Sequence, residues 1–427
     1  MSDTAAITSP RYFYGYNLAA YSFVISFLAS SFFLHSRGIF FPYWMEEFAA
    51  EKTQISLVIS LTLFTGSCIA PLTGYCIDRF PVRAIIIIAA LWLAVGYALL
   101  QLVDGYIVFL LTLVVFQGIG WTGVGPLAQT KLMVNWFSRN RGMALGVAIM
   151  GISVAGIIMP TAATFLAENI GWRDTYSLYA VTLLAVVIPL TLLVVKQEPA
   201  ELGLNPDGDP TPHESPSALT ATATTTSTQT NRAVYKEFLT SKAFWSIVIT
   251  FGLMNGVYSA MITHLPTYLT TELSFDLYQA SYMLGVAGAF AIAGKIVLGW
   301  MMDHISAKVT VLSAVSAYLL STIIFMSVNS YGLMMLAAGL FGLGFGGMVP
   351  VRSVLLSRLF GVAKFSRVNG LLSFFLAPAT FWVLITGYIA DTTGTYVTAF
   401  QVWAVAFVLA GVVSAFIKLP ERHDAVN

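Results

Sequence analysis

Long apolar stretches alternate with short polar or charged breaks along most of the chain. A helix needs roughly 20 mainly apolar residues to cross the roughly 30 Å of hydrocarbon in a bilayer. Twelve stretches are long enough, and a long polar interval divides them into two sets of six. They cover residues 14–41, 54–75, 84–103, 107–134, 142–167 and 175–195, and then 244–269, 278–302, 309–328, 331–356, 368–390 and 397–417. The pattern predicts an all-α membrane protein with twelve transmembrane helices.

Composition points the same way, because 57% of the 427 residues are hydrophobic and only 10% are charged. A typical soluble protein carries about 25% charged residues. The formal net charge of +1 is too small to indicate a nucleic-acid partner, which requires concentrated Lys and Arg. We therefore expect the lipid bilayer, and no nucleic acid, to surround this chain.

No familiar catalytic or cofactor-binding motif is present in the sequence. Cys68 and Cys76 lie on one predicted helix, about 12 Å apart along its axis, which is too far for a disulfide. We expect no metal site, no cofactor and no enzyme activity. The chain also lacks a Gly-x-x-x-x-Gly-Lys phosphate loop, so transport would be driven by gradients and not by ATP.

The polar interval 196–242 contains the stretch 220–230, which is almost entirely Thr, Ala and Ser. Such a composition buries too little apolar surface to fold by itself. We expect a six-helix bundle over residues 1–195, a flexible cytoplasmic linker over 196–242, and a second six-helix bundle over 243–427. Placing both termini in the cytoplasm puts most of the 21 basic residues on that side, as expected for a multi-pass protein of the cell inner membrane.

Three short patterns recur at a nearly constant offset of about 225 residues, which indicates that the two halves are copies. Because each half has an even number of spans, both copies run in the same direction through the membrane, with a cavity expected between them. The three patterns are Gly74 to Asp78, which returns as Gly299 to Asp303; Gly118 to Pro126, which returns as Gly342 to Pro350; and Ala167-Glu168 with Gly171, which returns as Ala390-Asp391 with Gly394.

The first of these patterns resembles the signature of the major facilitator superfamily between helices 2 and 3. The segment 136–146 resembles the start of helix 5 in monocarboxylate transporter-like carriers, and 198–208 is similar to the linker start of bacterial members. The resemblance implies a major facilitator fold of two pseudo-symmetric bundles. It also implies a cytoplasmic gate made of Gly74, Asp78, Arg79, Arg83, Asp303, Arg139 and Arg141. The alternative is that these charges only anchor tight turns.

Lys295 is the clearest candidate for a substrate contact. A charged side chain at mid-membrane costs roughly 2.5 to 3.5 kcal/mol on insertion scales, and no acid lies within a helical turn of Lys295. Asp303, at the end of the span, is about 12 Å away and beyond the reach of a lysine. In the resembled family, a basic residue of helix 8 binds the substrate carboxylate. Family members often have Arg there, which grips a carboxylate with two N–H groups, as Lys does not.

His35 and Arg37 lie near the outer end of the first span. Two residues differ by about 200° around a helix, so both face one cavity only if the helix unwinds. In the mammalian-type carriers of the resembled monocarboxylate transporter family, a Lys lies near the position of His35. Those carriers also have an Asp where this chain has Ala291, so the usual carboxylate for proton coupling is absent. A histidine ordinarily titrates near neutral pH, so His35 is an alternative proton carrier. Arg37 could instead reach lipid phosphates.

Three further polar residues are candidates for substrate binding, namely Arg352, Gln117 and Asn255. The competing explanation is snorkelling of Arg352 to the membrane surface and helix-to-helix hydrogen bonding by the two amides. We expect a monomeric secondary transporter of a small carboxylate, most simply a monocarboxylate, with proton coupling left open. The alternatives are a dicarboxylate or organic-anion exchanger, or a membrane sensor that binds a solute without passing it.

Overall fold

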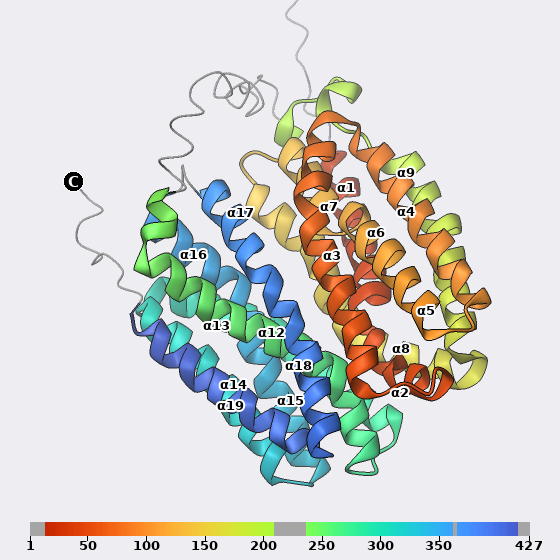
Figure 1. Cartoon of the computed structure of the whole chain (residues 1–427). Coiled ribbons are helices and arrows are strands. Elements are labelled where there is room, and N and C mark those ends of the chain that lie inside the picture. Colours follow the sequence, from red (N-terminus) through yellow and green to blue (C-terminus); the bar gives the residue numbers. More distant parts are fainter. Residues whose placement is uncertain (1–12, 209–235, 362–364, 417–427) are drawn as a thin grey trace, which may run out of the picture.

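The computed structural model describes residues 13–208, 236–361 and 365–416. This part of the chain is helical and contains no β-strand. Figure 1 shows that α1 to α9 form one bundle, coloured red to yellow, and that α12 to α19 form a second bundle, coloured green to blue. The prediction of an all-α protein with two helical bundles is confirmed.

The helices of the N-terminal bundle are interrupted in three places by a π-helical turn. These turns are Ser31–His35, Leu113–Gln117 and Leu183–Val187. The α-helices are α1 (Gly15–Ser30), α2 (Arg37–Glu47), α3 (Lys52–Arg79), α4 (Val82–Leu99), α5 (Tyr106–Thr112), α6 (Gly118–Val124), α7 (Pro126–Trp136), α8 (Arg141–Thr182) and α9 (Ile188–Val194).

The helices of the C-terminal bundle are α12 (Lys242–Thr271), α13 (Leu277–His304), α14 (Ala307–Ser327), α15 (Tyr331–Gly346), α16 (Met348–Phe360), α17 (Phe365–Leu376), α18 (Trp382–Thr393) and α19 (Tyr396–Ser414). A short break at Gly347 separates α15 from α16, and the 3-10 turn Ala377–Phe381 separates α17 from α18.

Among the described residues, eleven continuous helical segments are long and apolar enough to cross a membrane. The longest, Arg141–Val194, has 54 residues and would extend for about 80 Å, more than twice the hydrocarbon thickness. Its backbone turns at Gly171, where φ is 80° and ψ is 162°. Only glycine adopts such angles readily, so Gly171 divides this segment into two crossings, and the twelve predicted spans are all present.

The two bundles meet along α3 and α18, along α8 and α13, and along α2 and α12. Small residues allow close approach, as is usual between membrane helices. A Cβ atom on Gly38 of α2 would collide with the Ile262 carbonyl of α12, and one on Gly288 of α13 would collide with the backbone of Gly156 in α8.

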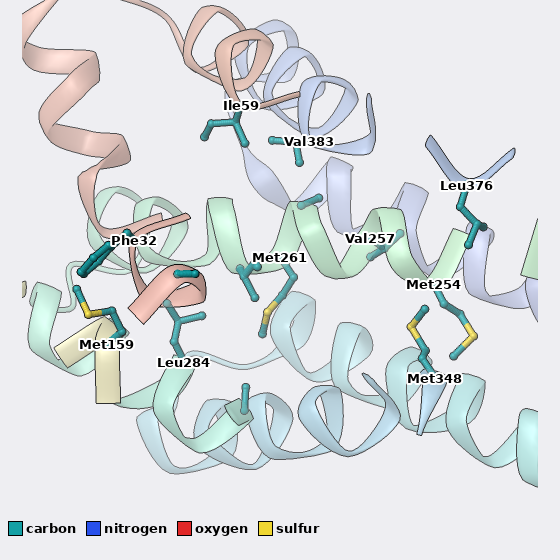
Figure 2. Packing of buried hydrophobic residues seen from close by; sticks show 14 of the residues in the cluster. Phe32, Ile59, Met159, Met254, Val257, Met261, Leu284, Met348, Leu376 and Val383 are labelled. Carbon is teal, nitrogen blue, oxygen red and sulfur yellow. The ribbon is translucent and has the colours of Figure 1, made fainter. Parts of the chain in front are cut away.

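Apolar side chains fill much of the space along these contacts. Ile59 of α3 and Val383 of α18 belong to one buried cluster, together with Met261 of α12. Figure 2 shows these residues with the methionines Met254 and Met348, whose flexible side chains fill the space beside α12. The bundles are therefore held together by tight packing as well as by the polar contacts described below.

The first part of the polar interval packs against the N-terminal bundle. The indole Nε1 of Trp136 donates to the Lys196 carbonyl at 2.9 Å. Asp207 accepts from the backbone N–H groups of Ser138 and Arg139 at 2.8 and 2.6 Å, and thereby holds the turn that precedes α8. The Thr-rich stretch 220–230 lies outside the described residues, and the domain boundaries at 195 and 242 stay a prediction.

Candidate functional site

A break in the first membrane-spanning segment positions His35 and Arg37. The π-helical turn Ser31–His35 ends the first part, and α2 begins at Arg37 after a single non-helical residue. Pro42 lies inside α2 and removes the hydrogen bond to the Gly38 carbonyl. His35 and Arg37 line two different cavities, as positions about 200° apart on a helix would, so the break does not bring them together.

His35 lines a cavity between the bundles with an empty volume of about 340 Å³. Residues of α8, α12 and α13 complete the lining: Gly156, Pro160, Tyr258, Ile262, Leu284, Ala287 and Gly288. The ring of His35 lies against Gly156, and its Nε2 atom is buried without a hydrogen-bond partner among the described residues. An unsatisfied ring nitrogen facing a cavity is available to a ligand.

Lys295 lies in α13 on the same interface between bundles. Its ammonium donates a hydrogen bond to the hydroxyl of Ser153 in α8, which belongs to the opposite bundle. No ion pair joins Lys295 to a carboxylate in the described part of the chain. The ammonium and Arg37 are the two charged groups that act on His35 electrostatically. The structure thus brings together three basic side chains near one interface, and Lys295 points toward the other bundle, not toward lipid.

Arg37 is 4% exposed and lines a second cavity, with an empty volume of about 230 Å³, inside the N-terminal bundle. Its Nε and Nη2 atoms have no hydrogen-bond partner among the described residues. Phe33, Trp44, Ile59, Thr62, Leu113 and Gln117 complete the lining. Arg37 is therefore buried in protein and does not reach the lipid phosphates.

The three remaining candidate residues lie in different surroundings. Gln117 lines the Arg37 cavity and donates to the Phe32 carbonyl and the Tyr97 hydroxyl, both at 3.2 Å. Asn255 is half-buried in α12, and Arg352 is half-buried in α16 with its Nε atom unpartnered among the described residues. The structure places Gln117 beside Arg37; it gives Asn255 and Arg352 no place in either of the two cavities.

At one end of the molecule, Asp78 of α3 forms an ion pair with Lys131 of α7 at 2.7 Å. Arg79 and Arg83, which the resemblance placed in the same gate, form no ion pair with Asp78 among the described residues. The Arg79 guanidinium lies over the Tyr75 ring, 5.0 Å from its centroid, and Arg83 is the second residue of α4.

The other expected gate residues lie at the same ends of their helices. Arg139 precedes α8, and Arg141 begins it and donates to the Phe137 carbonyl at 3.3 Å. Asp303 lies in the last turn of α13. A Cβ atom on Gly74 would meet nothing within 4 Å, so close packing does not explain this glycine.

At the opposite end, Asp391 of α18 joins the two bundles. Its carboxylate accepts from the backbone N–H and the hydroxyl of Thr53, both at 2.6 Å, and lies 3.8 Å from the Lys52 ammonium. Thr53 is the second residue of α3, so the acid sits at the positive end of a helix dipole from the opposite bundle.

The internal repeat gives this contact a counterpart. Glu168, the repeat equivalent of Asp391, interacts with Tyr278, the second residue of α13. Both receiving helices start with a capping box, formed by Glu51 and Gln54 in α3 and by Asp276 and Gln279 in α13. The sequence shows that an acid recurs at positions 168 and 391. It does not show which helix each acid contacts.

Further polar contacts between the bundles lie near Asp391. The Ser60 hydroxyl of α3 donates to the Thr380 carbonyl and accepts from the Leu384 N–H, each at 3.1 Å. His264 of α12 is fully buried; its Nε2 atom bonds the Val383 carbonyl within the C-terminal bundle at 2.9 Å and lies 3.3 Å from the Ser56 hydroxyl of α3 in the other bundle. The Ser60 and His264 contacts close the Asp391 end of the interface, and they could not be predicted from the sequence alone.

Comparison with known proteins identifies the family. Residues 19–328 and 295–427 match the family model of the Major Facilitator Superfamily. These ranges span nearly the whole chain, and the chain belongs to the Major Facilitator Superfamily. It is accordingly a multi-pass membrane transporter and not an enzyme.

Two curated relatives cover most of the chain at low identity. The chain is 23% identical to the Uncharacterized MFS-type transporter YcxA of Bacillus subtilis, over 96% of both proteins. It is 24% identical to Monocarboxylate transporter 11 of Homo sapiens, over 91% of this chain and 79% of that protein.

A bacterial homolog of the human lysosomal transporter Spinster, solved in an inward-facing and occupied conformation, has a similar structure. The TM-score is 0.70 at 13% identity, and the match covers 95% of this chain and 96% of that one. At this identity the similarity concerns the fold alone, which is the predicted major facilitator fold.

Proposed function

We propose that this protein is a secondary transporter that moves a small organic anion of the monocarboxylate class by alternating access. The observation that carries the proposal is Lys295. Its ammonium lies between the bundles, has a neutral hydroxyl as its partner, and forms no ion pair with a carboxylate among the described residues. An ammonium so placed is stabilised by an anion that enters between the bundles.

The proposed mechanism uses the fact that Lys295 and Ser153 belong to different bundles. A carboxylate that binds Lys295 would replace the Ser153 hydroxyl as its partner and neutralise the buried charge. A ligand shifts a conformational equilibrium only through different affinities for the two states. Here the hydrogen bond between Lys295 and Ser153 stabilises the closed interface. A bound anion would replace Ser153 as the partner of Lys295, so the closed interface would lose that stabilisation.

The names of curated relatives support the substrate class, since several are monocarboxylate transporters. A dicarboxylate is the second candidate, because His35 supplies a further basic group near Lys295. An exchanger of this kind would require a preloaded counter-anion and would ignore a pH gradient, which separates it from proton symport.

For proton coupling we propose His35 as the carrier. The charged and titratable groups around it are Arg37 of α2, Lys295 of α13 and Tyr258 of α12, while α8 contributes the uncharged Gly156 and Pro160. An anion bound beside a histidine favours the protonated, cationic form of its ring. Proton and anion would therefore bind together, which is the requirement for symport.

For topology we propose a monomer in the cell inner membrane with both termini in the cytoplasm. In that orientation Asp78 and Lys131 lie at the cytoplasmic end, with Arg79, Arg83, Asp303, Arg139 and Arg141 near the same helix ends. Asp391 lies at the outer end. Opening to the cytoplasm would require the contacts near Asp78 to break, and opening to the outside would require those of Asp391 to break.

Substitution of Lys295 tests the proposal. In proteoliposomes, Lys295→Ala should lower uptake of radiolabelled lactate or pyruvate at least tenfold, with unchanged insertion and thermal stability. Lys242→Ala is the matched control, because Lys242 is an exposed lysine at the start of α12, and it should transport normally. Normal uptake by Lys295→Ala would remove this residue from the binding site.

A further inference from the structure

The cavity beside Arg37 is separate from the one that His35 lines. All of its lining residues come from the N-terminal bundle: the π-helical turns Ser31–His35 and Leu113–Gln117, α2, and α3. The two cavities share no lining residue. The Arg37 cavity therefore needs an explanation that does not depend on substrate bound between the bundles.

The unsatisfied polar atoms at this cavity are all hydrogen-bond donors. They are Nε and Nη2 of Arg37 and Nε1 of Trp44, and none has a partner among the described residues. The two side chains are 4% and 1% exposed. A buried donor without a partner costs roughly 1 to 3 kcal/mol, and more when it is charged, so three such donors at one cavity indicate that a ligand accepts their hydrogen bonds.

The charge of the lining selects the kind of ligand. Arg37 carries a positive charge, no acidic residue lines the cavity, and no ion pair joins Arg37 to a carboxylate in the described residues. Aromatic and aliphatic groups, including Phe33, Ile59 and Leu113, form the rest of the wall. A guanidinium in such surroundings is stabilised far better by an anion than by a neutral molecule.

The size of the cavity limits the anion. Only a small part of the empty volume is open to a sphere of the size of water, enough for about one such sphere, which excludes an organic acid of several carbon atoms and restricts the ligand to a single small ion. We propose that Arg37 and Trp44 bind a monovalent inorganic anion of chloride size inside the N-terminal bundle. The bound ion neutralises the charge of Arg37. The transported anion then neutralises only the charge of Lys295.

Binding of radiolabelled chloride to the purified full-length protein tests this proposal. Saturable binding of about one chloride per chain is expected in a gluconate buffer of constant ionic strength. Chloride should also raise the melting temperature above its value in gluconate. Arg37→Gln should abolish both effects. Trp44→Phe replaces the indole by a smaller aromatic ring and removes its N–H donor. It should weaken chloride binding roughly tenfold, the equivalent of about 1.4 kcal/mol.

Trp403→Phe is the matched control. Trp403 is also buried, but it lies in the C-terminal bundle, and its Nε1 donates to the Thr386 hydroxyl at 3.0 Å. This change should leave chloride affinity as it is. Non-saturable binding, or equal affinity in Trp44→Phe and the native protein, would overturn the proposal.

Lys295→Ala separates this site from the substrate site. The variant should bind chloride with native affinity even where organic-anion uptake is lost. Loss of chloride binding in Lys295→Ala would mean that the anion belongs to the cavity between the bundles, and the separate site would be disproved. Should Lys295→Ala transport normally while Arg37→Gln loses chloride binding, the proposed substrate site fails and the chloride site stands.

Discussion

At the scale of residues, the chemistry of this protein depends on three basic side chains with different partners. Lys295 bonds a hydroxyl of the opposite bundle, whereas the Nε2 atom of His35 and two nitrogens of Arg37 have no partner among the described residues. Positions 35 and 37 are about 200° apart on a helix, and in the structure His35 lines the cavity between the bundles while Arg37 lines the cavity inside the N-terminal bundle. The helix break at Ser36 therefore does not bring these two side chains into one cavity.

Substitution of His35 tests its proposed role as proton carrier. His35→Gln keeps a polar side chain but cannot be protonated, so uptake of the organic anion should become independent of pH between about 5.5 and 7.5. Uptake should be measured with and without a proton gradient. His304→Gln is the control, since His304 lies exposed at the end of α13. A pH profile like that of the native protein would exclude His35.

At the scale of elements, each bundle places an acid near the start of a helix in the other bundle. Asp391 of α18 meets the start of α3, and Glu168 of α8 meets the start of α13. The two contacts differ in strength, because Asp391 accepts two hydrogen bonds and lies near a lysine. The contact between α3 and α18 should therefore control opening at this end.

Asp391→Asn removes the negative charge from that contact. A hydrogen bond to a charged group contributes roughly 1.5 to 3 kcal/mol, so the open state at this end should become at least several-fold more populated. Ser60→Cys, placed deeper on the buried face of α3 in a chain whose free Cys68 and Cys76 are replaced by Ala, reports this opening through its labelling rate with a maleimide. Labelling should rise in Asp391→Asn and stay constant in Glu46→Gln. Equal rates in all backgrounds would contradict the assignment of a gate.

Gly171 permits the turn between two crossings of the membrane. A side chain at φ 80° and ψ 162° is strained by roughly 1 to 3 kcal/mol, although a Cβ atom there would meet no neighbour within 4 Å. Gly171→Ala should lower the melting temperature by several degrees in detergent. Gly142→Ala, in the helical part of α8 and equally free of neighbours, should not. Equal melting temperatures would show that the turn does not require glycine.

At the scale of the whole molecule, two bundles are joined through a polar interval whose beginning is part of the fold. Residues 198–208 contact the N-terminal bundle through Asp207, which accepts hydrogen bonds from the backbone just before α8. The stretch 220–230 has a composition that favours no packed structure. The two parts of the interval should respond differently to deletion.

Deletion of residues 220–230 should leave uptake and melting temperature within about a fifth of their native values, because a flexible connection of different length changes little energetically. Deletion of the equally long segment 198–208 should lower both, since the backbone N–H groups before α8 lose the Asp207 carboxylate as their acceptor. Expression, melting temperature and uptake would be measured side by side. Loss of folding on deletion of 220–230 would show that this stretch is not a simple linker.

The number of spans, the two-fold repeat and the family signature were determined by the sequence. Apolar length reflects membrane thickness directly, and Gly74, Asp78 and Asp303 are local patterns that need no contact information. The candidates Lys295, His35 and Arg37 could also be predicted from the sequence, since an ionisable residue within an apolar span is apparent without a structure.

Tertiary structure alone decided which charges meet. Asp78 pairs with Lys131 and not with the arginines beside it, Lys295 reaches Ser153 in the other bundle, and Asp391 contacts Thr53. Each partner is far away in the sequence, and its direction depends on helix breaks and on how closely glycines let the helices approach. Local composition sets where a helix lies in the membrane, whereas partners are selected by packing between helices.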